Sequence, residues 1–262
     1  MRTATSADGT AIAFDESGHG PPVVMVVGAF NARSTTAPLA AELASRFTVF
    51  NYDRRGRGDS GDSADTPAHA VEREIEDLAA VIAAAGGSAC VFGYSSGATL
   101  ALKAAAAGLP ISKLALYEPP FLLDDSRPRP PADLPRQLTE LVSAGRRGDA
   151  VELYQARAVG MPDEVVVRLR SAPFRPGLEA IARTLIYDAS IIGDLSLPTA
   201  MMSTITTPTL VLDGEDSWPF MRDGVQAAAD ALPSGRRHTL AGQTHDIDPS
   251  ATAPVLEEFF AN

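Results

Sequence analysis

Cysteine, lysine and histidine are scarce in this chain of 262 residues, and long apolar runs are absent. The single Cys90 excludes an internal disulfide and a cysteine-based metal site, and four histidines argue against a histidine-rich one. No run of about 18 apolar residues could span a membrane, and the first residues lack the apolar core of a secretory signal. We therefore expect a cytoplasmic protein with no metal site and no membrane contact.

Positive charge is also in short supply, because 33 acidic residues outnumber 22 basic ones and give a net charge of −11. Nucleic-acid binding requires a basic surface, so we expect no nucleic-acid partner. The densest basic cluster is Arg54, Arg55 and Arg57, and it alternates with aspartates at 53, 59 and 62. That alternation favours a solvated or internally paired loop over a phosphate-binding site.

What the sequence does have is an ordinary globular composition and a regular alternation of elements. A hairpin with an Asp-Gly turn is expected over 3–14. Apolar strand patterns at 22–27, 47–52, 89–92 and 113–117 then alternate with helical patterns at 36–45, 71–85 and 96–107. This order predicts an α/β fold, with a parallel sheet that carries helices on both faces.

The alternation stops after residue 123. Helices are predicted near 134–145, 147–158, 163–171 and 177–190, with no strand among them, before strand and helix patterns resume at 208. We therefore expect one core formed by residues 1–123 and 205–262, with a helical insertion over 124–204.

The segment 93–97 reads Gly-Tyr-Ser-Ser-Gly and fits the pattern G-x-S-x-G. A buried strand precedes it and a helix of small residues follows, which is the setting of a sharp strand-to-helix turn. Flanking glycines let the neighbouring backbone approach such a turn. The turn would raise the Ser95 hydroxyl at the carboxyl edge of the sheet, where open α/β folds bind their ligands.

With these features the chain resembles the α/β-hydrolase superfamily. Residues 53–60 (Asp-Arg-Arg-Gly-Arg-Gly-Asp-Ser) look like that family's D-x-R-G-x-G-x-S loop, and Thr244-His245-Asp246 follow the last strand, where the family's histidine lies. The resemblance implies a mostly parallel, eight-stranded sheet flanked by helices, with 124–204 in the place of the family's cap. It also implies a cofactor-free serine nucleophile.

In that framework Ser95 is the candidate nucleophile and His245 the base that it needs. The acid stays open between two carboxylates. Relatives usually place an aspartate three residues after the glycine that ends the seventh strand, but here that position, counted from Gly214, is Ser217. Asp216 lies one residue early, whereas Glu118 follows the sixth strand, where some relatives place the acid; we favour Glu118.

An oxyanion hole requires two backbone N–H groups directed at one point. The resemblance assigns them to Ser96, which follows the nucleophile, and to Ala29, in the loop after the third strand. Phe30, Tyr94 and Trp218 are candidate walls of the substrate pocket. An apolar lining of this kind favours an uncharged or weakly polar small-molecule substrate.

The leading hypothesis is a serine hydrolase that cleaves a carboxylic ester or lactone through an acyl-enzyme on Ser95. The alternatives on the same fold are C–C bond hydrolysis, perhydrolysis, lyase or cyclase chemistry, and a non-catalytic small-molecule receptor. Neither the substrate nor the oligomeric state is indicated by the sequence.

Overall fold

A single eight-stranded sheet forms the centre of the computed structural model, which describes residues 1–63 and 65–261. The strand order is β1-β2-β4-β3-β5-β6-β7-β8, in which β2 is antiparallel to both neighbours and the others run parallel. The strands are β1 (Arg2–Thr5), β2 (Ala11–Gly18), β3 (Pro22–Val26), β4 (Thr48–Tyr52), β5 (Ala89–Tyr94), β6 (Ile111–Tyr117), β7 (Thr209–Gly214) and β8 (Gly235–Leu240). The expected mostly parallel α/β sheet is confirmed.

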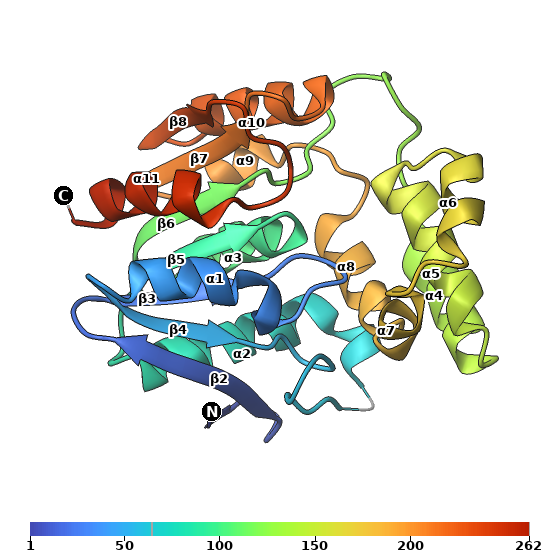
Figure 1. Ribbon diagram of the computed structural model, residues 1–262, viewed down its shortest axis with the longest axis horizontal. Coiled ribbons are helices and arrows are strands. Elements are labelled where there is room, and N and C mark those ends of the chain that lie inside the picture. The colour runs from blue at the N-terminus through green and yellow to red at the C-terminus, as the bar shows by residue number, and fades with distance from the viewer. Residues whose placement is uncertain (64, 262) are drawn as a thin grey trace.

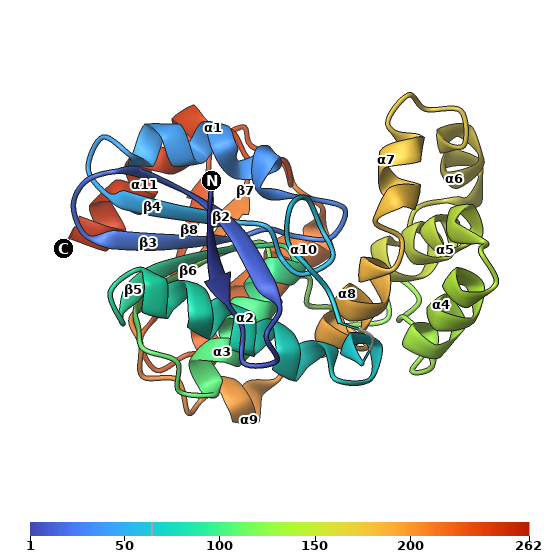
Figure 2. The same ribbon diagram turned by 90° about the horizontal axis from the view of Figure 1, so that it is seen from below.

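Helices cover both faces of this sheet (Figures 1 and 2). Two helices, α1 (Arg33–Leu43) and α11 (Pro249–Ala261), pack on one face. The other face is covered by α2 (Ala70–Ala84), α3 (Ser96–Ala106) and α10 (Pro219–Ala231), and η1 (Thr66–Ala68) leads into α2. The sheet is therefore the middle of three layers.

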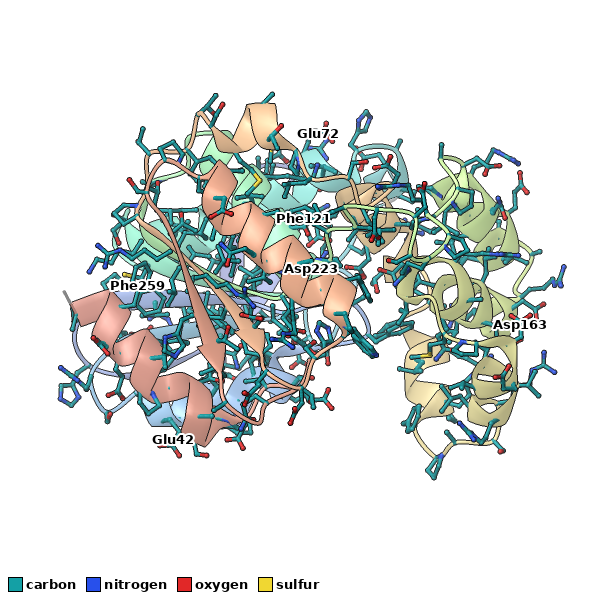
Figure 3. The ribbon with its side chains drawn as sticks, turned by 90° about the horizontal axis from the view of Figure 1, so that it is seen from above. Glu42, Glu72, Phe121, Asp163, Asp223 and Phe259 are labelled. Atoms are coloured by element: carbon teal, nitrogen blue, oxygen red, sulfur yellow. The ribbon has the colours of Figure 1, made fainter. Side chains whose placement is uncertain are left out.

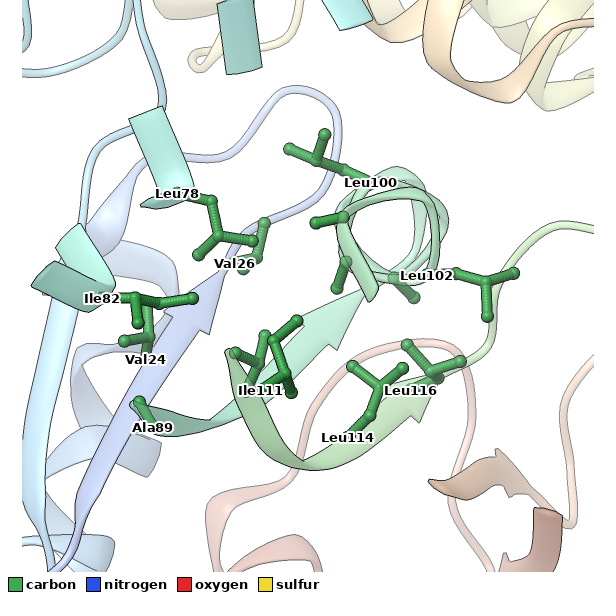
Figure 4. Close-up of a cluster of buried hydrophobic side chains, with 14 of the residues drawn as sticks. Val24, Val26, Leu78, Ile82, Ala89, Leu100, Leu102, Ile111, Leu114 and Leu116 are labelled. Carbon is green, nitrogen blue, oxygen red and sulfur yellow. The ribbon is translucent and has the colours of Figure 1, made fainter. Parts of the chain in front are cut away.

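Alternating side chains of the buried strands supply both cores. In β3, Val24 and Val26 face the α2–α3 side, whereas Val23 and Met25 face the α1–α11 side, and all four are fully buried. Figure 4 shows the first of these cores, where Val26 lies beside Leu78 of α2 and Val24 lies beside Ile82 of the same helix. A strand buried on both faces needs a continuous apolar run, which is what residues 23–27 provide.

The chain between β6 and β7 is helical, as expected. It contains α4 (Leu134–Ser143), α5 (Arg147–Tyr154), η2 (Gln155–Val159), α6 (Asp163–Leu169), α7 (Arg175–Ala180), α8 (Thr184–Ile192) and α9 (Thr199–Met202). Helices α4 to α7 form a lobe beyond the ends of the strands, and α8 lies between this lobe and the sheet (Figures 1 and 2). Figure 3 shows Asp163 on the lobe and Phe259 on α11 at opposite ends of the molecule.

Two details of this helical segment differ from simple expectation. The helix predicted over 177–190 is interrupted by a turn at 181–183, so that α7 and α8 are separate. In addition, Met202 belongs to the buried cluster of the sheet, so the end of the segment packs on the core rather than on the lobe. Within residues 1–63 and 65–261, none of the helices combines the length and the apolar character that crossing a membrane requires.

Candidate active site

The candidate residues come together at the carboxyl edge of the sheet. Ser95 follows β5, Glu118 follows β6, Ala29 lies in the loop after β3, and His245 lies in the loop after β8. Parallel strands end at one edge, so residues far apart in the sequence meet there. A cavity of about 560 Å³ opens at this edge, and Ser95, Ala29 and His245 line it.

Ser95 sits on a strained turn. Its φ of 55° and ψ of −121° lie outside the regions that residues other than glycine prefer. A Cβ on Gly93 would lie 2.7 Å from the carbonyl oxygen of Gly97, so the turn is too tight for a side chain there. The N–H of Ser95 donates to the carbonyl oxygen of Tyr117 at 2.9 Å, which ties the turn to β6. The packing of the sheet thus holds the strained serine in place.

A buried carboxylate contacts His245. The Nδ1 atom of His245 lies 2.6 Å from Oε2 of Glu118. Glu118 is fully buried and has a positive φ of 47°. The imidazole also contacts two aromatic rings, with centroid distances of 5.1 Å to Tyr94 and 5.7 Å to Trp218. An imidazole that donates from Nδ1 to a carboxylate presents Nε2 as an acceptor, which is the tautomer that a general base needs.

The two carboxylates left open by the sequence have different environments. Glu118 Oε1 accepts the N–H of Gly214 and Oε2 accepts the hydroxyl of Ser217, both at 2.9 Å. Asp216 is exposed at the edge of the cavity, and the carboxylate within hydrogen-bond distance of His245 is that of Glu118. Ser217, which takes the position of the usual aspartate, is thus a site residue that the sequence analysis did not single out.

The residues expected to supply the two N–H donors are both near Ser95. Ser96 is the first residue of α3, so its N–H has no partner within the helix. Ala29 follows Gly28, whose backbone lies so close to the turn that an added Cβ would be 2.9 Å from Cβ of Ser95. Both Ala29 and Ser96 line the cavity.

The cavity wall is largely apolar. Phe30, Tyr94 and Trp218, the expected wall residues, all line it. Burial, together with the nearby charges of Asp246 and Glu118, raises the pKa of Tyr94, so its hydroxyl stays protonated at neutral pH. The segment between β6 and β7 adds three polar side chains, which are Arg127, Tyr154 and Gln155. Tyr154 is one of the contacts that the sequence predicts for the cap, whereas the sequence does not identify Arg127 and Gln155. Tertiary contacts put them there, and their local sequence carries no signal of it.

The arginine-rich loop after β4 is internally paired, and it is buried rather than solvated. Arg54, Arg55 and Arg57 are at most 1% exposed, and each forms an ion pair with a buried carboxylate. Arg54 and Arg57 share Asp188 of α8, a residue that no sequence pattern singled out. Its two arginine partners lie more than 130 positions away in the chain, so local patterning could not reveal it.

The chemistry that this arrangement allows is acyl transfer. It combines a hydroxyl nucleophile, an imidazole supported by a carboxylate, and two N–H groups beside them. Among residues 1–63 and 65–261, no group of three histidine, cysteine, aspartate or glutamate side chains is arranged to hold a metal ion.

Comparisons with known proteins agree with the fold. The model of a family described as "Alpha/beta hydrolase family" matches residues 23–257. The solved structure of an alpha/beta hydrolase from Sphaerobacter thermophilus is 55% identical, with a TM-score of 0.91 over 99% of this chain and 100% of that one. A search of curated proteins gave no match.

Two more distant structures share the fold. A thermophilic esterase from Thermogutta terrifontis is 22% identical, with a TM-score of 0.72 over 99% of this chain and 97% of that one. The enol-lactonase from Burkholderia xenovorans is 18% identical, with a TM-score of 0.74 over the whole of both chains. At such identities the likeness concerns the fold alone.

Proposed function

We propose that this chain, which belongs to the alpha/beta hydrolase family, is a serine hydrolase that cleaves a carboxylic ester or a lactone of a small, largely apolar substrate. Ser95 is the nucleophile, His245 the general base and Glu118 the acid that orients it. Ala29 and Ser96 donate the two N–H groups of the oxyanion hole, and residues 124–204 act as the cap. No cofactor takes part in the proposed reaction.

The observation that carries the proposal is the contact of 2.6 Å between Glu118 Oε2 and His245 Nδ1, beside a serine held at a φ of 55°. A buried carboxylate in contact with an imidazole fixes the tautomer and stabilises the imidazolium that forms during the reaction. A strained serine at a cavity has no evident structural role, and strain of this kind gathers at functional sites.

In the first half of the reaction, Ser95 Oγ attacks the carbonyl carbon and transfers its proton to Nε2 of His245. The oxyanion that forms accepts hydrogen bonds from the N–H groups of Ala29 and Ser96. The imidazolium then gives its proton to the leaving oxygen, and the C–O bond of the ester breaks. An alcohol departs from a linear ester, whereas in a lactone the alcohol stays attached to the acyl group.

In the second half, water attacks the acyl-enzyme and His245 accepts a proton from it. The bond to Ser95 Oγ breaks, the serine regains the proton, and the carboxylic acid leaves. A cavity of about 560 Å³ lies within the range of sites for small ligands. Its apolar wall and the aromatic rings around His245 support a substrate with little charge at the reacting centre.

The first experiment is the intact mass of the protein after treatment with a fluorophosphonate, which phosphorylates an activated serine. Wild type should gain a single adduct, Ser95→Ala should gain none, and Ser112→Ala should react like wild type. Ser112 is a suitable control because it is exposed in β6, away from the cavity. A folded wild type without an adduct would contradict the proposal.

Turnover then separates the hydrolase from the receptor that the sequence left open. A series of p-nitrophenyl esters from acetate to octanoate, together with five- and six-membered lactones, should be hydrolysed over many cycles. The acyl-chain length that is hydrolysed fastest reports the depth of the cavity. A receptor would instead show ligand-dependent thermal stabilisation without product, and Ser95→Ala would keep that stabilisation.

A further inference from the structure

We infer that Asp188, acting through Arg54, Arg57 and Ser96, is a positioning residue that aims both N–H groups of the oxyanion hole. We call these four residues the Asp188 cluster. The inference rests on the proposed function, because it takes the N–H groups of Ala29 and Ser96 as the donors. It goes beyond that function by assigning a role to a side chain of α8 that the reaction itself does not use.

One half of the Asp188 cluster holds the residue after the nucleophile. The hydroxyl of Ser96 donates to Oδ1 of Asp188 at 2.7 Å, and Nη1 of Arg54 donates to the same oxygen at 2.9 Å. Arg54 is held in turn by Glu74, with both of its contacts at 2.6 Å. The first turn of α3, which carries the N–H of Ser96, is thereby attached to a carboxylate with no exposed surface.

The other half of the cluster holds the loop that carries Ala29. Nη1 of Arg57 donates to the carbonyl oxygen of Gly28 at 2.6 Å and to that of Asn31 at 3.2 Å. Nη1 of Arg54 donates to the carbonyl oxygen of Val27 at 3.1 Å. The loop is therefore fixed on both sides of Ala29.

The contact with Gly28 has a direct geometric consequence. The carbonyl of Gly28 and the N–H of Ala29 belong to one planar, trans peptide unit, in which the two bonds point in opposite directions. Because Arg57 holds the carbonyl end, it fixes the direction in which the N–H of Ala29 points. A hydrogen bond to the carbonyl also polarises the peptide and makes its N–H a stronger donor.

Asp188 joins the two halves. Its Oδ1 accepts from Ser96, and its Oδ2 accepts from Nη2 of Arg57 at 2.6 Å. In the part of the chain that the structure describes, Asp188 is the only carboxylate paired with Arg57, whereas Arg54 also has Glu74. Loss of the Asp188 charge would leave Arg57 buried without its counter-ion and free to shift, and the N–H of Ala29 would shift with it.

A second buried ion pair nearby provides a matched control. Arg55, which is fully buried, donates twice to Asp77 at 2.7 Å and once to Asp8 at 3.0 Å. Its remaining hydrogen bonds go to Ser6, Ser63, Thr66 and the carbonyl oxygen of Arg73, all away from the oxyanion loop. Asp77→Asn thus removes a carboxylate charge from one buried arginine outside the site, whereas Asp188→Asn removes the carboxylate that two buried arginines share.

The experiment compares wild type, Asp188→Asn and Asp77→Asn, with active sites counted by fluorophosphonate. For Asp188→Asn, kcat on a p-nitrophenyl ester should fall about 10- to 100-fold, below the loss from deleting a donor outright. KM should stay within about 3-fold, since substrate binding in the ground state does not use the oxyanion hole fully. The inhibition constant of an alkyl boronic acid, whose tetrahedral adduct places an oxygen in the hole, should rise by the same factor as kcat falls. The inhibition constant of the unreactive amide analogue should stay unchanged.

Asp77→Asn should lower the melting temperature and leave kcat per active site unchanged. If the two variants lose activity alike, or if Asp188→Asn raises KM at constant kcat, the inference is wrong. If Asp188→Asn does not fold, Ser96→Ala decides instead. It keeps the backbone N–H and deletes the hydroxyl, which donates to Asp188 and accepts from Nη1 of Arg54 at 3.4 Å. Its kcat and boronate affinity should therefore fall together, and an unchanged kcat would overturn the inference.

Failure of the proposed function is recognised separately. A folded wild type that neither gains a fluorophosphonate adduct nor turns over esters would remove the proposed function, and this inference with it. That result is read on wild type alone, before any variant of the Asp188 cluster is compared.

Discussion

Replacing Glu118 by glutamine should nearly abolish turnover while keeping the shape of the site. Glu118 accepts three hydrogen bonds, from Gly214 and Ser217 at 2.9 Å and from His245 at 2.6 Å. An amide has one acceptor oxygen and one donor nitrogen. If its oxygen faces Gly214, its NH₂ group faces the imidazole, which must then accept at Nδ1 and carry its proton on Nε2. That tautomer cannot accept the proton of Ser95.

The size of the effect follows from the lost charge. A carboxylate and an imidazolium about 4 Å apart attract by ~4 kcal/mol at an effective dielectric constant of about 20. At ~1.4 kcal/mol per tenfold change in rate, this is worth about three powers of ten in kcat. The wrong tautomer raises the loss toward 10⁴, as in serine proteases that lack the acid. We therefore expect kcat to fall by about 10³- to 10⁴-fold.

The assay measures kcat on p-nitrophenyl butyrate for wild type, Glu118→Gln and Asp216→Asn, with circular dichroism and thermal melting as checks of folding. Asp216→Asn is the matched control, because it removes a carboxylate charge from the same edge of the site at an exposed position. It should change kcat by less than about 3-fold. The reasoning would be refuted if folded Glu118→Gln kept more than about a tenth of the activity while Asp216→Asn lost most of it.

Three further predictions concern the surroundings of the site. Ser217→Ala removes one hydrogen bond to the Glu118 carboxylate and should lower kcat/KM about 10-fold in ester assays, with the melting temperature nearly unchanged. Gly93→Ala forces a Cβ to 2.7 Å from the Gly97 carbonyl oxygen, so urea unfolding should show a loss of about 1–3 kcal/mol, and an unchanged midpoint would argue against so tight a turn. Burial alone would raise the pKa of Asp188, but its two arginine partners outweigh burial and hold it below 3.8. The charge therefore stabilises the fold above that pH, and the contribution is lost as the pH falls through the lowered pKa. The stability difference between wild type and Asp188→Asn should be constant at neutral pH and narrow below pH 3.8.

Local features of the sequence determine the fold and the position of the nucleophile. The alternation of apolar strands with helical patterns predicts the layered sheet, because each pattern depends on residues within one element. The glycines at 93 and 97 predict the sharp turn at Ser95 for the same reason, since the steric requirement lies within five residues. The place of His245 follows from chain order, because the loop after the last strand reaches the same edge.

Only the tertiary structure decided which carboxylate contacts His245 and what surrounds the site. Glu118 and His245 are 127 positions apart, and their contact depends on the backbone after β6 and on hydrogen bonds from β7 and its loop. Asp188 and Arg57 are farther apart still, at 131 positions. Nothing in the sequence around Asp188 indicates that it pairs with Arg54 and Arg57. By local pattern the arginines resemble a solvated or internally paired loop, because alternating charges are typical of surfaces. The structure has the paired loop, and it is buried. A charge without solvent must find a partner, and folding alone brings those partners together.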